Sequence, residues 1–171
     1  MLVSTKVHSF FYRWFFLLLL CSGVAFANEF SLQLASEKDN VLVGESIPVT
    51  LTLAYPPEYE PCAWILTFFE SNVPKEFLEA LNLTEKLSKA ARPEWRYVNY
   101  STNWFPKGKR DFQEKTVQIK TTDKWPAGDY KCLIQILYRN KTAPSTTTDK
   151  YISQSFSFTV EAKKEGEKAG Q

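Results

Sequence analysis

The feature that most constrains the fold of this chain is an alternation of apolar and polar side chains with a period of two residues. Between residues 47 and 55 the odd-numbered positions are Ile, Val, Leu, Leu and Tyr, and two of the intervening ones are Thr. The same alternation recurs at 30–34, 114–121 and 152–160. This period places successive side chains on opposite faces of a β-strand, one towards a core and one towards water. About seven such strands with turns between them predict an all-β fold, an antiparallel β-sandwich.

One segment breaks this pattern. Residues 74–91 consist largely of good helix formers, and Pro74 suits the first turn of a helix. Phe77 and Leu81 stand four residues apart and would share one face, while Pro93 marks an end. The sequence therefore predicts one inserted helix of about three to four turns at 74–91, between two strands of the sandwich.

The amino-terminal segment has the features of a secretory signal. Residues 14–21 form a short apolar run after a basic start, and Ala25–Ala27 ends the segment with the small residues that a signal peptidase recognises. We expect a signal peptide at 1–27, a β-sandwich domain at 28–160 and a disordered charged tail at 161–171. The protein would then be exported, either periplasmic or secreted. The alternative is a retained amino-terminal membrane anchor.

Removing that segment changes the charge balance. The whole chain has 21 Lys and Arg against 19 Asp and Glu, and the segment 1–27 holds Lys6 and Arg13 but no acidic residue. The remaining chain therefore has 19 of each and a net charge of zero. A nucleic-acid binder needs a basic face to displace phosphate counterions, so this balance argues against that class of protein.

Three cysteines occur, and Cys21 falls within the predicted signal peptide. Cys62 and Cys132 remain. An even pair in an exported chain favours a disulfide, because the compartment is oxidising. The alternative left open is a pair of separate buried cysteines.

The histidine content bears most directly on function. The only histidine is His8, which lies in the predicted signal peptide. Serine and cysteine hydrolases use an imidazole that exchanges a proton near neutral pH, and zinc sites draw on His and Cys. No glycine-rich phosphate-binding motif and no pair of cysteines at C-x-x-C spacing is present. We therefore predict a non-enzymatic protein with no cofactor and no metal.

Two short motifs resemble a known family. Residues 127–132 read Ala-Gly-Asp-Tyr-Lys-Cys, and 44–47 read Gly-Glu-Ser-Ile before an alternating strand. They resemble bacterial immunoglobulin-like β-sandwich modules, among them the amino-terminal region of oxygen-tolerance (aerotolerance) proteins of the bacterial envelope. The resemblance implies an immunoglobulin-like sandwich in which the Tyr130 hydroxyl bonds to nearby backbone. Cys62 and Trp64 depart from the pattern of antibody domains, where a Trp follows the first Cys by about a dozen residues.

Aromatic residues are the candidates for binding. Trp95, Tyr97, Trp104 and Phe105 alternate with polar side chains near the ends of one expected strand, and Tyr59 lies in a proline-rich connection. Such rings anchor protein partners or stack on sugars when they are exposed. The alternative for each of them is a place in the core.

These observations together predict an exported, non-catalytic binding module that contacts a protein partner in the cell envelope or outside the cell. A lipid or small apolar ligand held between the two sheets is one alternative. A carboxylate-based glycan-processing enzyme is another, because two acids suffice for that chemistry and Glu58, Glu60 and Glu70 lie near aromatic residues. Each of the three requires a different site.

Overall fold

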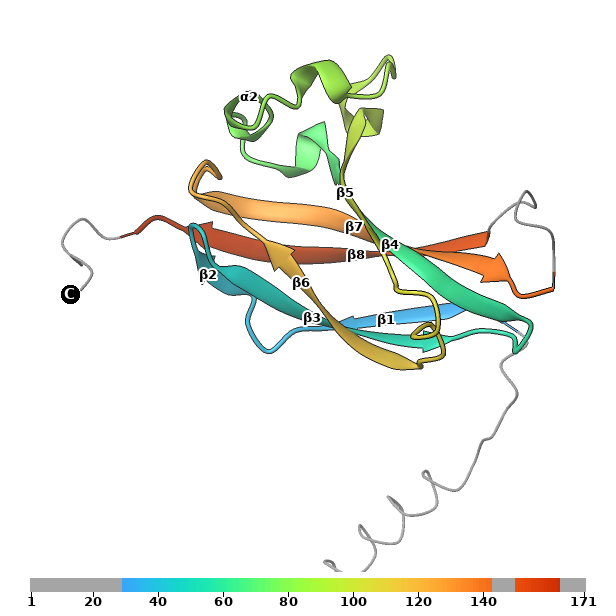
Figure 1. Ribbon diagram of the computed structural model, residues 1–171. Coiled ribbons are helices and arrows are strands. Elements are labelled where there is room, and N and C mark those ends of the chain that lie inside the picture. Colours follow the sequence, from blue (N-terminus) through green and yellow to red (C-terminus); the bar gives the residue numbers. More distant parts are fainter. Residues whose placement is uncertain (1–28, 143–149, 164–171) are drawn as a thin grey trace, which may run out of the picture.

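The computed structural model describes residues 29–142 and 150–163, and the predicted signal peptide lies outside them (Figure 1). Two sheets face each other. The three-stranded sheet has the order β1 (Ser31–Ala35), β3 (Ser46–Ala54), β6 (Glu114–Lys120). The five-stranded sheet has the order β2 (Asn40–Leu42), β8 (Lys150–Glu161), β7 (Gly128–Asn140), β4 (Tyr59–Phe69), β5 (Tyr97–Trp104). In the described part of the chain, no helix is both long enough and apolar enough to cross a membrane.

This strand order confirms the predicted immunoglobulin-like sandwich. The fourth, seventh and eighth strands are neighbours in one sheet, and the first, third and sixth form the other, as in the two sheets of that fold. All pairings are antiparallel except the short parallel contact between β2 and the end of β8. The sheets are therefore built from the alternating segments that the sequence indicated.

The core lies between the two sheets. Ile47, Val49 and Leu51 of β3 are fully buried, and so are Ile134 and Ile136 of β7. Each fully buried aliphatic side chain of this size contributes about 1.5–3 kcal/mol relative to exposure. The alternation seen in the sequence thus becomes the inward face of each strand.

The predicted helix at 74–91 is wrong in its length. The insertion between β4 and β5 contains one α-helical turn, α2 (Phe77–Ala80), and three short 3₁₀ turns, η1 (Glu70–Asn72), η2 (Thr84–Lys86) and η3 (Pro93–Trp95). It stands at one end of the five-stranded sheet (Figure 1).

The helix ends early because Asn82 has a φ of 54°, the left-handed conformation that Asn tolerates better than most residues. The amide of Leu83 donates to Leu78 O at 2.7 Å and that of Asn82 to Glu79 O at 3.0 Å, which closes a Schellman motif. Leu78 and Leu83 are both buried beneath it.

An aromatic cluster attaches this insertion to the sandwich. The Phe77 ring is completely buried and lies 5.1 Å from Phe68, 4.9 Å from Trp125 and 5.2 Å from Tyr130. The Trp125 indole N–H donates to the Tyr100 hydroxyl at 3.2 Å. Edge-on aromatic pairs at these separations contribute beyond their buried area, so the short insertion is fixed by packing and not by helix propensity.

The predicted disulfide between Cys62 and Cys132 is wrong. Both residues are buried, but Cys132 stands opposite Phe68 in the register of β4 and β7, six residues along β4 from Cys62. Six residues of strand span about 20 Å, whereas disulfide-bonded Cα atoms lie within about 7 Å. Each sulfur instead lies near a backbone carbonyl, Cys62 Sγ at 3.2 Å from Leu137 O and Cys132 Sγ at 3.4 Å from Phe156 O.

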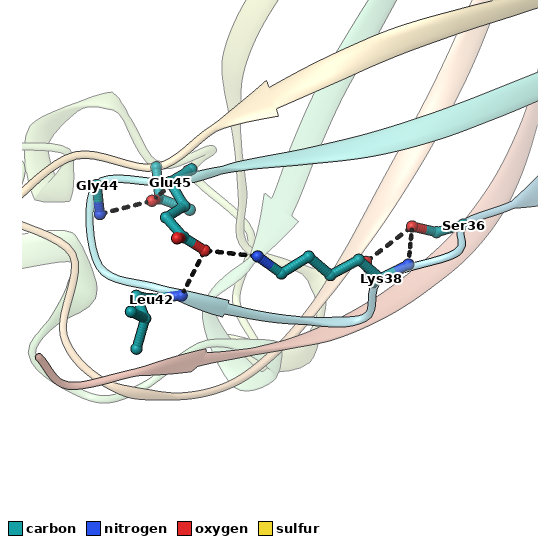
Figure 2. A network of polar contacts seen from close by, with 6 residues as sticks. Ser36, Lys38, Leu42, Gly44 and Glu45 are labelled. Atoms are coloured by element: carbon teal, nitrogen blue, oxygen red, sulfur yellow. Dashed lines mark hydrogen bonds and ion pairs between the residues drawn. The ribbon is translucent and has the colours of Figure 1, made fainter.

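The turn before β3 is held by one carboxylate. Glu45 accepts a hydrogen bond from Lys38 Nζ at 2.7 Å and another from the Leu42 amide at 3.1 Å (Figure 2). Gly44 has a φ of +87° in this turn, a backbone conformation that residues other than glycine rarely adopt. The hydrogen bond from Lys38 and the one from the Leu42 backbone lower the pKa of Glu45 below its ordinary value.

The corner before β7 has the contact that the immunoglobulin resemblance implied. The Tyr130 hydroxyl donates to Pro126 O, four residues upstream, at 2.7 Å. The ring of Tyr130 stacks on Phe158 at 5.3 Å and is buried. This bond closes the turn that leads from the β6 side of the sandwich into the five-stranded sheet.

Candidate functional site

The outward-facing side of the five-stranded sheet presents side chains in rows that run across the strands. One row passes from β5 to β8 through Trp104, Ala63, Leu137 and Tyr151, which are opposite one another in the registers of successive strand pairs. We call this side of the sheet the outer face. Its strands are held in place by the buried side chains between them, so the outer face is a rigid surface.

The two ends of that row carry the largest exposed rings on the outer face. The Trp104 side chain is 60% exposed and that of Tyr151 is 69% exposed. Ala63, which lies next to Trp104 in the row, is completely buried. Three strand spacings separate the two rings, which amounts to about 14 Å. The row therefore has a large exposed aromatic ring at each end and smaller side chains between them.

The next two rows of the outer face contain no charged side chain. The members of both rows are Thr102, Ile65, Gln135, Ser153, Asn99, Thr67, Leu133 and Ser155. Within them the Thr67 hydroxyl, which is buried, hydrogen-bonds with the side-chain amides of Asn99 at 2.8 Å and Gln135 at 3.0 Å. The polar groups at the centre of the outer face are thus bonded to one another, which lowers the cost of removing water from them.

Two other predicted binding residues lie at the opposite end of β5. Trp95 is 60% exposed on η3, where the Arg92 guanidinium lies 5.2 Å from its ring centroid. Tyr97 is half-exposed and packs against Phe69 at 5.9 Å. Seven residues of β5 separate Tyr97 from Trp104, which corresponds to about 23 Å. The two ends therefore cannot form a single pocket.

The remaining two predicted binding residues point away from the outer face. Phe105 is buried and its ring packs edge-on against Phe112 at 4.9 Å. Tyr59 is half-buried, with its ring 5.0 Å from Phe30 and the Lys150 ammonium 5.5 Å from its centroid. Both rings complete the ends of the core, so neither belongs to the candidate surface.

Tyr151 was missed by reasoning from the sequence. The strand that contains it has Phe156, Phe158 and Val160 on its inner face, so every odd-numbered position of β8 faces outward. Tyr151 is one of these odd positions, and the alternation was sufficient to place it there. Tyr151 stands apart in sequence from the other aromatic candidates, and it joins Trp104 only because the row is assembled across four strands.

A groove beside the insertion has a different character. It holds about 600 Å³ between residues 71–74 of the insertion and the ends of β2, β7 and β8, and Asp39, Asp129 and Lys131 contribute to its lining. This groove is open and is lined by both polar and apolar side chains, whereas the space between the sheets is filled by completely buried side chains. The arrangement does not support the alternative of an apolar ligand held between the sheets.

The titratable groups with resolved shifts have pKa values that move away from neutrality. Burial raises the pKa of Cys132 to about 12, and burial also raises those of Tyr55, Tyr130 and Tyr138. Acid–base catalysis instead requires a pKa close to the working pH. Within residues 29–142 and 150–163, no group of three or more His, Cys, Asp or Glu side chains could hold a metal ion.

Comparisons with known proteins identify no family. No protein-family model matches the chain, and no curated protein matches it. Among solved structures, a cohesin module from a family 33 glycoside hydrolase of Clostridium perfringens ATCC13124 is similar to it, at 11% sequence identity and a TM-score of 0.41. The alignment covers 78% of this chain and 98% of that module. The fold assignment rests on the strand order and registers described above, and not on this likeness.

Proposed function

We propose that this protein is a non-catalytic binding module that holds a protein partner against the outer face of its five-stranded sheet. The observation that carries the proposal is the row from Trp104 to Tyr151, which has a large exposed ring at each end. Tyr and Trp are enriched among the residues that dominate binding energy, because they provide large contact areas with few rotatable bonds.

The chemistry between the rings supports a protein partner. The two rows on the Asn99 side of Trp104 and Tyr151 are neutral, and their central polar groups are already hydrogen-bonded within the sheet, whereas the nearest pair on the other side, Glu60 and Arg139, is charged. A partner can therefore cover them without stripping water from unpaired charges, which is the costly step in forming an interface. The spacing of about 14 Å between the rings fits within one partner's contact area of about 800 Å².

The predicted signal peptide supports a place outside the cytoplasm, in the envelope or beyond it. We propose that the partner is another extracytoplasmic protein. A rigid sheet presented by a small exported domain requires no conformational change on binding, which favours a preformed interface.

The test compares substitutions of the two rings in the row with a substitution of an equally exposed tryptophan elsewhere. Partners are captured from the native envelope with the chain from Asn28 onward, which contains every described strand, and the affinity for the captured partner is then measured by titration. Trp104→Ala and Tyr151→Ala should each weaken binding by roughly 30-fold, the effect of losing a strong anchor. Trp95→Ala is the matched control, because Trp95 is equally exposed at 60% but lies off the outer face.

All three variants remove exposed rings, so their thermal unfolding should match that of the wild type and exclude misfolding as the cause. The proposal fails if Trp95→Ala abolishes binding while Trp104→Ala and Tyr151→Ala leave it intact. It also fails if the purified domain turns over a substrate.

A further inference from the structure

The free edge of β5 is a feature separate from the outer face. Among the described strands, β5 is the last of the five-stranded sheet, so one side of its backbone pairs with β4 and the other has no neighbouring strand. Edge strands of this kind are ordinarily protected by charged residues, prolines or very short length, because their unpaired amides and carbonyls attract other strands.

The other edges have such protection, whereas that of β5 is limited to a bulge at Tyr100 and the contact of Ser88 with Tyr97. β1 and β2 have five and three residues, and β6 carries Glu114, Lys115 and Lys120. The part of β8 beyond β2 lies close to β1, which covers that side of the sandwich. By contrast, the eight residues of β5 read Tyr-Val-Asn-Tyr-Ser-Thr-Asn-Trp, with no charge and no proline. This composition also has a high β-propensity.

The pairing pattern shows which backbone groups of β5 point outward. Tyr97 faces away from β4, because its carbonyl and amide hydrogen-bond with the Ser88 amide and hydroxyl at 2.9 and 3.0 Å. Phe105 faces β4, because its amide donates to Cys62 O at 2.9 Å. Between them Tyr100 is the additional residue of a bulge, since Asn99 is opposite Thr67 and Ser101 is opposite Leu66.

The alternation then directs the backbone of Asn99, Thr102 and Trp104 outward. No described residue hydrogen-bonds with these outward amides and carbonyls. All three side chains lie on the outer face and are exposed. Among protein segments, an extended chain in a matching register satisfies donors and acceptors at this spacing, in place of the water that otherwise solvates them.

A second copy of β5 meets these requirements best in the register that uses both Thr102 and Trp104 of each copy. In a twofold antiparallel pairing, a residue whose backbone amide and carbonyl point away from β4 must stand opposite a residue of the same kind in the second copy. Pairing Tyr97 with Trp104 of a second copy would do so, but Ser88 already occupies the Tyr97 backbone. A twofold axis that passes through Asn103 instead places Thr102 opposite Trp104 of the second copy. By symmetry, Trp104 then stands opposite Thr102 of the second copy.

We propose that two copies of this protein associate through β5 in that register, joining their five-stranded sheets side by side. The strand is neutral, so a twofold pairing brings no like charges together. The exposed Trp104 ring would lie over Thr102 of the second copy, an aromatic–β-branched pair of the kind that stabilises sheets. The paired segment is short, so the dimer is weak and reversible. This self-association goes beyond the binding of a different protein proposed above.

The test is sedimentation equilibrium of the chain from Asn28 onward over a wide range of protein concentrations. Thr102→Pro removes an amide that points outward and is not used by β4, and proline is tolerated on edge strands. This variant should lower the association constant at least tenfold, whereas Thr102→Val, which keeps the amide, should leave it nearly unchanged. A wild type that stays monomeric, that forms only larger aggregates, or that dimerises no better than Thr102→Pro overturns the proposal.

Hydrogen exchange gives a second measurement that needs no variant. The amides of Thr102 and Trp104 should be protected at high protein concentration and exchange rapidly at low concentration. The exchange rate of the Phe105 amide, which is bonded to β4, should not depend on concentration. Concentration-independent exchange at Thr102 and Trp104 contradicts the dimer. Tyr151→Ala separates the two proposals, since it should weaken partner binding without altering self-association.

Discussion

Two tyrosines on the inner face of β7 differ in one respect that a hydroxyl deletion can measure. Tyr138 is completely buried, with its ring 4.8 Å from Phe30 and 5.4 Å from Tyr55, and its hydroxyl hydrogen-bonds with none of the described residues. Tyr130 is equally buried, but its hydroxyl donates to Pro126 O at 2.7 Å. The same substitution, Tyr to Phe, should therefore have opposite effects at the two positions.

The expected magnitudes follow from the desolvation of the hydroxyl. A buried hydroxyl without a partner costs about 1–3 kcal/mol, and Tyr138→Phe removes that cost while it keeps the ring contacts. We expect the free energy of unfolding to rise by about 1 kcal/mol or more. Tyr130→Phe removes a hydrogen bond worth about 1 kcal/mol and leaves the Pro126 carbonyl unpaired, so the free energy of unfolding should fall by about 1–2 kcal/mol.

The assay is urea unfolding of both variants and the wild type, followed by tryptophan fluorescence and extrapolated to water. The slope of free energy against urea should stay constant, because neither variant alters the surface exposed on unfolding. If Tyr138→Phe destabilises the protein as much as Tyr130→Phe does, the Tyr138 hydroxyl has a partner in the folded state and the reasoning is refuted.

Three further outcomes are expected. Phe77→Ala should lower the free energy of unfolding by about 3–5 kcal/mol in urea, and a loss below about 1 kcal/mol would mean that the insertion unfolds separately from the sandwich. The pKa of Cys132 is raised from 9.0 to about 12, so the stability that its neutral thiol contributes is complete below pH 9 and is lost between pH 9 and 12. When the free energy of unfolding is measured against pH, it should therefore decline less over that range in Cys132→Val than in the wild type. The pKa of Glu45 is lowered from 4.5, so its ionised carboxylate stabilises the fold above pH 4.5. The wild type should therefore have a higher free energy of unfolding than Glu45→Gln above that pH, and the difference should disappear in acid titration as the pH falls through the lowered pKa.

The sandwich was predictable because strand alternation is a local property. At 47–53 each residue's face follows from its neighbours, and the structure buries the expected side chains Ile47, Val49, Leu51 and Leu53. The length of the helix was not predictable from propensity alone. Asn82 was the available signal, since Asn often takes the left-handed position after a helix, but the summed propensity of 74–91 obscured it.

The cysteine pair shows where local reasoning ends. An exported chain enters an oxidising compartment, and the compartment determines whether two cysteines would be oxidised if they met. Whether they meet depends on the register of β4 against β7, which is fixed by contacts between residues some 70 positions apart in sequence. A slip of register would move Cys132 along β4, and nothing in the local pattern around either cysteine determines that offset.

The exposure of Trp104 has its origin in the bulge at Tyr100. In an unbroken strand, Trp104 would share a face with Val98 and Tyr100, both of which point into the sandwich. The additional residue reverses the parity, so that Trp104 turns outward and joins the row that ends at Tyr151. Tyr100 itself packs on Phe77 at 6.2 Å and accepts the Trp125 N–H, which ties the bulge to the aromatic cluster that holds the insertion. The bulge that turns Trp104 outward is therefore also the place where β5 contacts the aromatic cluster that anchors the insertion.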